Sequence, residues 1–155
     1  MINYLKFLMI IIFCHIPIFS HCQVPCGIYS DATRIFQINE DLKTIEKAMQ
    51  KIIDLSLKSD SQSLNQLNRW VTTKEDHSKN IQKIVSSYFL TQRIKIDTQD
   101  YPEKVILLHK ILVSAMKCKQ TTDKQNVSYL KSHLETFSKI YLDEHGIEHL
   151  NKLMK

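Results

Sequence analysis

A histidine and two cysteines stand close together near the start of the chain, directly behind an apolar stretch. They are His21, Cys22 and Cys26 in the segment "HCQVPCGIY", residues 21–29. Imidazole and thiolate groups bind transition metals, whereas two cysteines at this spacing can also close a small loop as a disulfide. The segment therefore predicts either a metal site or a disulfide staple, the latter with Cys118 buried and inert.

The residues in front of this segment have the composition of a secretory signal peptide. Lys6 precedes an apolar run over residues 7–19, and Ser20 is a small residue suited to the position before a cleavage site. The run is shorter than the roughly 20 apolar residues that a membrane-spanning helix needs. We therefore expect a signal peptide over residues 1–20, export to a secreted or periplasmic location, and no stable membrane span in the mature domain, residues 21–155.

Cleavage after Ser20 gives His21 a free α-amine, whose pKa lies close enough to neutrality for it to lose its proton to a metal. That amine, the amide nitrogen of Cys22 and the thiolates of Cys22 and Cys26 can lie in one plane, with the His21 imidazole approaching axially. Planar nitrogen–sulfur coordination suits Ni(II) or Cu(II), whereas zinc prefers a tetrahedron. The expected cleavage therefore creates the metal site.

The composition limits the kinds of fold and partner. The chain has 155 residues, 43% of them hydrophobic, which suits one domain with a substantial core. It holds only 2 Gly and 3 Pro, which favours long helices over a turn-rich β fold. The formal charge is +5, but the lysines are dispersed and no basic run interleaves with aromatic residues, so we expect no nucleic-acid partner.

Apolar residues recur at helical spacing in four segments. The first runs from about residue 32 to 57, and the second follows a polar turn in which Ser61 is a candidate N-cap. Pro102 suits the first turn of the third, and Gly146 is expected to end the fourth, with a short tail or an extra helical turn behind it. The core faces are expected to carry Ile35, Ile38, Leu42, Ile45, Met49, Ile52, Leu64, Leu67, Trp70, Val71, Ile81, Ile84, Val85, Tyr88, Phe89, Val105, Leu108, Leu112, Ala115, Val127, Leu130, Leu134, Phe137 and Tyr141. Short connections between four such helices predict an all-α, up-down four-helix bundle with the metal-binding hook at its N-terminus.

The apolar stripe of the second helix is interrupted at "KEDHS", residues 74–78. Helical spacing between Val71 and Ile81 points Lys74 and either His77 or Ser78 inward. Two interpretations remain open. The polar side chains belong to a hydrogen-bonded rim of the bundle, or one of them is directed at a functional site near one end.

The segment "HCQVPCGIY" resembles the nickel-hook motif His-Cys-x-x-Pro-Cys-Gly-x-Tyr of the nickel superoxide dismutases, with all six fixed residues in order. The resemblance continues through "RWVTTKEDHSKNIQKIVSSYFLTQRIK", residues 69–95, which is similar to the second helix of that family. It implies four-helix bundles assembled as a homohexamer. It also implies an enzyme that converts superoxide to oxygen and hydrogen peroxide by cycling nickel between Ni(II) and Ni(III).

The resemblance assigns roles by position. His21 supplies the amine and the axial imidazole, Cys22 the amide nitrogen and one thiolate, and Cys26 the other thiolate. By the same resemblance, Tyr29 is expected beside the open face of the metal, where it helps to position superoxide or ordered water, and Tyr88 resembles a second tyrosine found near the hook.

Two positions around the axial ligand depart from the family pattern. Phe36 stands where the family often has an acidic residue that holds the axial imidazole, and Gln37 or Glu40 is a candidate replacement. His77 stands where some members have an arginine that assists the same imidazole. These departures bear on the tuning of the axial ligand more than on nickel binding.

Three hypotheses follow. The leading one is an exported nickel superoxide dismutase. The second is an exported nickel- or copper-binding helical protein without dismutase turnover, which the change at Phe36 keeps open. The third is a disulfide-stapled bundle without a metal.

Overall fold

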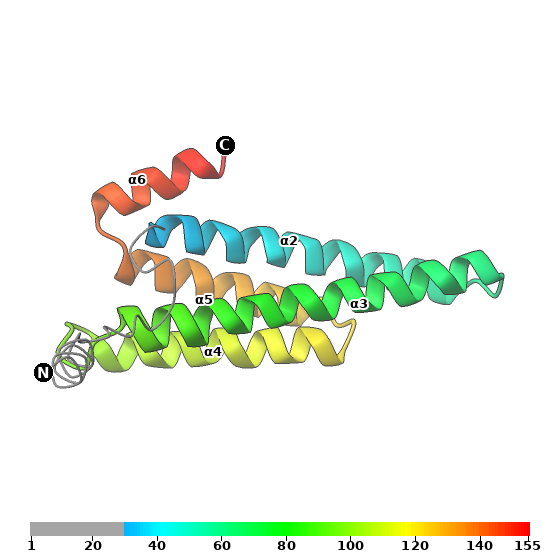
Figure 1. The fold of residues 1–155 in the computed structure, drawn as a ribbon, viewed down its shortest axis with the longest axis horizontal. Coiled ribbons are helices and arrows are strands. Elements are labelled where there is room, and N and C mark those ends of the chain that lie inside the picture. Colours follow the sequence, from blue (N-terminus) through cyan, green and yellow to red (C-terminus); the bar gives the residue numbers. More distant parts are fainter. Residues whose placement is uncertain (1–29) are drawn as a thin grey trace, which may run out of the picture.

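The computed structural model of the protein describes residues 30–155. The predicted signal peptide and the hook, including His21, Cys22, Cys26 and Tyr29, lie outside the described residues. The described chain folds into α2 (Asp31–Ser56), α3 (Ser61–Lys83), a π-helical segment η1 (Ile84–Arg93), α4 (Tyr101–Gln120), α5 (Gln125–Tyr141) and α6 (Glu144–Leu153) (Figure 1).

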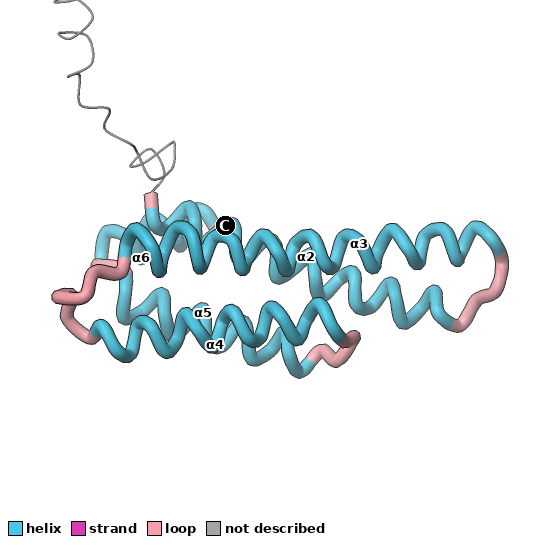
Figure 2. The backbone as a smooth tube through the Cα atoms, turned by 60° about the horizontal axis from the view of Figure 1, so that its bottom comes forward, coloured by secondary structure: helices cyan, strands magenta, loops and turns pink. Residues whose placement is uncertain are grey.

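The four long helices run alternately up and down, and α6 turns back over the start of α2 (Figure 1). The predicted all-α, four-helix bundle is thereby confirmed, with α6 as an additional element. The hairpin of α2 and α3 projects beyond the loop that joins α4 to α5 (Figure 2). No helix in the described part is long and apolar enough to cross a membrane.

Side-chain caps mark the starts of α2, α3 and α6, whereas α4 begins with a proline in its first turn. The Ser30 hydroxyl accepts a hydrogen bond from the Thr33 amide at 3.2 Å, at the start of α2. The carboxylate of Asp60, and not Ser61 as predicted, caps α3, because it accepts from the Ser63 amide at 2.9 Å. Pro102 lies in the first turn of α4, as predicted.

Gly146 does not end the fourth helix, so this prediction is wrong. Helix α5 ends at Tyr141, and Leu142 has an extended backbone. The carboxylate of Asp143 then accepts a hydrogen bond from the Gly146 amide at 2.7 Å and caps a new helix, α6. The glycine therefore lies in the first turn of α6 rather than behind the last turn of α5.

The residues predicted for the core faces of α2 and α5 pack in the core. Several of those predicted for α3 and α4 are exposed or only partly buried. In α3 the predicted core residue Leu64 is 47% exposed. It lies in the first turn of α3, next to the loop of the α2–α3 hairpin, and this hairpin projects beyond the other two helices (Figure 2). In α4, Val105 and Leu112 are only partly buried. The buried face of α4 instead carries Leu107, Leu108, Ile111, Ala115 and Cys118.

Candidate metal centre

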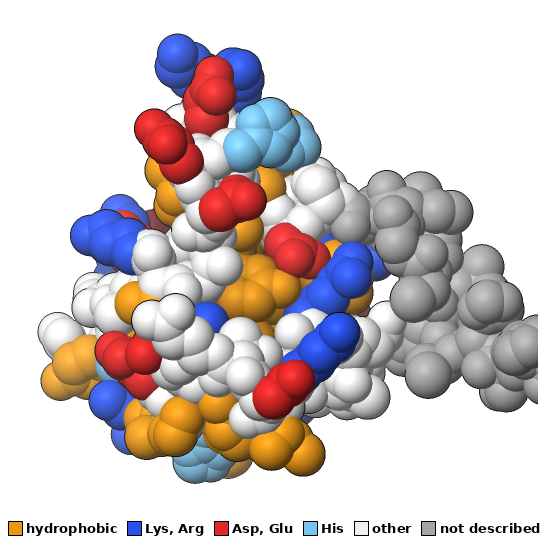
Figure 3. Space-filling view, turned by 90° about the vertical axis from the view of Figure 1, so that its left-hand side faces the viewer, with side chains coloured by type: hydrophobic (Ala, Val, Ile, Leu, Met, Phe, Trp, Pro, Cys, Tyr) orange, Lys and Arg blue, Asp and Glu red, His pale blue; other side chains and the backbone are white. Residues whose placement is uncertain are grey.

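The end of the bundle at which α2 begins faces the viewer in Figure 3. It carries a cluster of polar side chains around Asp31. One carboxylate oxygen, Oδ1, accepts a hydrogen bond from the Tyr88 hydroxyl at 2.6 Å. The other, Oδ2, accepts from the Tyr141 hydroxyl at 2.8 Å. The Arg93 Nε atom lies 3.1 Å from Oδ1. Asp31 therefore ties the start of α2, immediately behind the hook, to η1 and α5.

The π-helical segment brings Arg93 over Tyr88. In an α-helix, residues five apart point about 140° away from each other. The i→i+5 turns of a π-helix bring such residues nearly into line, and π-turns are frequent at functional sites. Accordingly, the Arg93 guanidinium lies 4.9 Å from the centre of the Tyr88 ring and donates a hydrogen bond to the Tyr88 hydroxyl at 2.9 Å.

Both tyrosines of this cluster are held in their neutral form. Burial, followed by the hydrogen bond to Asp31, raises the pKa of the Tyr88 hydroxyl above its ordinary value. The same two causes raise the pKa of Tyr141 strongly. Both hydroxyls therefore act as proton donors to Asp31 at neutral pH.

A second polar group joins α2 to α3 inside the bundle. The Asp41 carboxylate, only 6% exposed, accepts from His77 Nδ1 at 2.6 Å and from the Asn80 side-chain amide at 2.6 Å. Since an ionised carboxylate only accepts hydrogen bonds, the proton of a neutral His77 ring lies on Nδ1, and Nε2 is left as an acceptor. Asp41 thus fixes both the orientation and the tautomer of His77.

At the interrupted stripe, residues 74–78, the rim interpretation is confirmed for Lys74, whereas a functional role of His77 stays a prediction. Lys74 and Ser78 are buried, whereas the His77 side chain is 37% exposed and lies at the edge of the helix interface. The Lys74 ammonium donates to the backbone carbonyls of Cys118, Lys119 and Thr121, so it is a hydrogen-bonded rim residue. His77 alone among the three keeps an outward-facing edge.

The described residues offer few ligands for a metal ion. Within residues 30–155, no group of three or more His, Cys, Asp or Glu side chains could hold a metal ion. Cys118, the one cysteine in this range, is fully buried, and burial raises the pKa of its thiol to about 11. Since a thiolate is the metal ligand, Cys118 is unsuited to bind a metal. The sulfur ligands predicted from the sequence, Cys22 and Cys26, lie outside the described residues, and two thiolates with nitrogen donors are a set that fits nickel.

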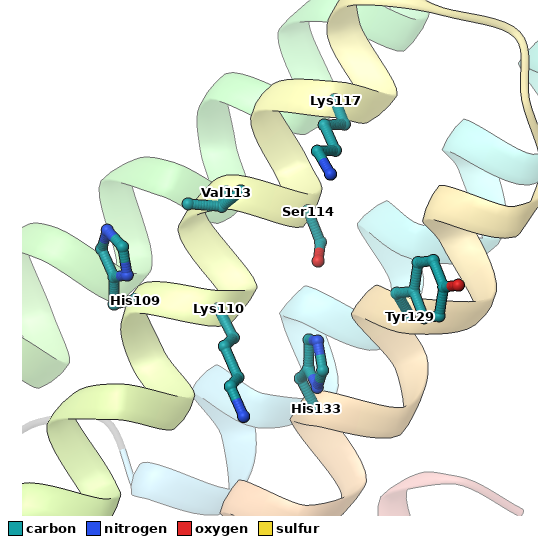
Figure 4. A pocket seen from close by; sticks show the side chains of 7 residues that line it. All are labelled: His109, Lys110, Val113, Ser114, Lys117, Tyr129 and His133. Atoms are coloured by element: carbon teal, nitrogen blue, oxygen red, sulfur yellow. The ribbon is translucent and has the colours of Figure 1, made fainter.

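Two of the hollows on the described surface bear on the site. One, of about 430 Å³, runs between α4 and α5 on a hairpin, residues 101–141, that carries seven Lys and three acidic residues (Figure 4). Burial and the neighbouring Lys110 lower the pKa of His133 there. Neither His77 nor Tyr88, the predicted site residues within the described range, lines this hollow. The other, of about 370 Å³, adjoins the Asp31 cluster and is lined by Ser30, Asp31, Ala32, Tyr141, Leu142, Asp143, His145, Gly146 and His149.

Of the predicted site residues within the described range, Tyr88 lies in the Asp31 cluster and His77 in the Asp41 pair. Of the two candidate replacements for the family's acidic residue, Gln37 accepts a hydrogen bond from Arg34, and Glu40 pairs with Lys43 on the surface. Sequence reasoning missed Asp41. Its position in the sequence could have revealed it, because Asp41 directly precedes the core residue Leu42 and follows the core residue Ile38 by three positions, on the same side of the helix.

Comparison with known proteins identifies the family. The model of the family described as nickel-containing superoxide dismutase matches residues 17–145. No curated protein and no solved structure shows a significant match to the chain. Since the family match spans most of the chain, the protein belongs to the nickel-containing superoxide dismutases and is an oxidoreductase with nickel as its cofactor.

Proposed function

We propose that the enzyme dismutates superoxide at a nickel ion held by the N-terminal hook, residues 21–29. The observation that carries this proposal is the state of Cys118, which is buried as a protonated thiol and leaves Cys22 and Cys26 as the sulfur donors of the mature chain. When bound, nickel supplies one-electron redox chemistry between Ni(II) and Ni(III).

The hook residues have distinct roles. The α-amine and imidazole of His21, the amide nitrogen and thiolate of Cys22, and the thiolate of Cys26 hold the metal. Tyr29 positions superoxide at the open face. Tyr88 is supported as a nearby neutral hydroxyl, since it is anchored on Asp31 two residues beyond Tyr29.

His77 orients the imidazole of His21 in place of the family's arginine. The contact to Asp41 supports this role, since a histidine fixed by a buried carboxylate presents Nε2 in one direction. Asp41 then supplies the carboxylate that is missing at position 36, and it acts on the His21 imidazole through His77. Phe36 itself packs against the core.

Export and assembly complete the proposal. Removal of residues 1–20 by a signal peptidase exposes the His21 amine and places the enzyme outside the cytoplasm. The mature chains assemble as a homohexamer, as the resemblance implies.

The decisive experiment measures the intact mass, nickel content and superoxide turnover of the mature protein. We expect an N-terminus at His21 and one nickel per chain. Cys22→Ser or Cys26→Ser should abolish nickel binding and turnover while leaving the helical content unchanged, because the described core uses neither residue. Cys118→Ser is the matched control and should keep its nickel. A mature chain that begins elsewhere, or Cys22→Ser and Cys26→Ser variants that retain nickel, would overturn the hook proposal.

A further inference from the structure

The start of α6 carries a local charge opposite to that of the chain. The segment "DEHGIEH", residues 143–149, holds three carboxylates and two imidazoles but no Lys or Arg, in a chain of formal charge +5. Figure 3 shows acidic and histidine side chains together on this projecting helix. Glu148 pairs with Lys152 one turn further along α6 at 2.7 Å, so the local excess of negative charge comes from Asp143 and Glu144. This excess favours cations here over the surrounding basic surface.

The two imidazoles of this segment face the same space. His145 and His149 are four residues apart on α6, so they are neighbours on one helix face. Both line the hollow of about 370 Å³ beside the Asp31 cluster. Nδ1 of His149 lies 3.4 Å from the hydroxyl of Ser30, the residue that follows the hook in sequence.

Neighbouring carboxylates of this hollow are already engaged. Asp31 accepts from Tyr88 and Tyr141, and Asp143 caps α6. No third His, Cys, Asp or Glu completes a metal site with the pair among residues 30–155. A metal ion held here has two imidazole ligands and water in its other positions. Imidazole suits nickel, and such a site exchanges its ion more readily than one with two thiolates.

We propose that the His145–His149 pair is an acquisition site that captures Ni(II) and delivers it to the hook. The delivery step rests on the proposed function of the hook. It is a ligand exchange without oxidation or reduction. The bonds from nickel to the two imidazoles break, bonds to the hook amine, amide and sulfurs form, and the protons of those groups pass to water. The contact between His149 and Ser30 supports this exchange, because Ser30 directly follows the hook in the sequence.

The first test removes the hook ligands and titrates nickel alone. The mature chain carrying His21→Ala, Cys22→Ser and Cys26→Ser should bind one Ni(II) per chain by calorimetry. Adding His145→Gln and His149→Gln should abolish that binding. Adding His109→Gln and His133→Gln, a histidine pair on α4 and α5, should leave it unchanged. Circular dichroism checks that α6 stays folded. Binding that persists without His145 and His149, or that is lost equally in the control, overturns the site.

The second test follows nickel loading of the intact hook by the absorbance of the nickel–thiolate bonds. At limiting Ni(II), His145→Gln with His149→Gln should slow loading several-fold, while the nickel content at saturation stays the same. Unchanged loading overturns delivery even if the pair binds nickel. If the parent hook takes up no nickel, the hook proposal fails, whereas the titration of the hook-less chain still reports separately on the pair.

Discussion

Asp41 gives His77 an orientation that its own helix does not provide. The carboxylate is buried, and its two oxygens are divided between His77 and Asn80, so the imidazole has one preferred position. A residue that orients a metal-bound imidazole typically changes activity by about 10- to 100-fold. We therefore expect His77→Ala to lower the rate of superoxide turnover by roughly that factor and to leave nickel content almost unchanged.

Asp41→Asn tests whether His77 acts through its carboxylate partner. The amide keeps the shape but not the charge, so turnover should fall in the same direction as in His77→Ala, with a matching change in the spectrum of the oxidised nickel centre. Glu40→Gln is the control, because Glu40 pairs with Lys43 on the surface. If His77→Ala is as fast as the parent from about pH 6 to pH 9, His77 is a rim residue.

How much of this site the sequence predicts depends on the distance between partners along the chain. The hook motif is local, so its nine residues could be identified without a structure. Asp41 and His77 are 36 residues apart, and Asp31 and Tyr141 are 110 apart. Only the packing of α2 against α3 and α5 brings these partners together, and no periodicity in one helix encodes it.

At the scale of elements, Lys74 of α3 holds the end of α4. Its ammonium donates to the carbonyls of Cys118 at 2.8 Å, Lys119 at 2.6 Å and Thr121 at 3.0 Å. The last carbonyls of a helix lack partners within it and carry partial negative charge. Burial lowers the pKa of Lys74, so the hydrogen bonds must offset the cost of burying its charge.

Lys74→Met should therefore destabilise the bundle. The methionine fills a similar volume but leaves buried carbonyls without a donor, which costs about 1–3 kcal/mol. Urea unfolding followed by circular dichroism measures the loss. Lys79→Met is the control, since Lys79 is exposed and pairs with Glu75 and Asp76 on the same helix, and it should change stability by less than about 0.5 kcal/mol. Equal effects of the two substitutions would contradict this role.

Two elements differ from the sequence-based prediction, each for its own physical reason. Helix α6 depends on Asp143 as its cap, and a glycine three residues later suggests the end of one helix as readily as the start of another. In η1 the apolar residues predicted for the core are buried, as in an α-helix. The backbone hydrogen bonds, however, join residues five apart instead of four. Hydrophobic periodicity detects the first property and not the second.

At the scale of the whole molecule, the projecting α2–α3 hairpin exposes apolar side chains near its tip. Ile53 is 39% exposed, Leu57 85% and Leu64 47%. Single exposed apolar residues are ordinary, but several on one projection favour contact with another chain. This supports the tip as part of the contact surface in the proposed homohexamer.

Leu57→Asp combined with Leu64→Asp should then shift the assembly toward smaller species, since two charges would have to be buried in the contact. Light scattering at working concentration measures the mass. Ile96→Asp is the matched control, because Ile96 is also 85% exposed but lies in the loop between η1 and α4, away from the tip. A parent enzyme that is fully active as a monomer would contradict the assembly itself. A double variant with the parent's mass would show that the chains meet through another surface.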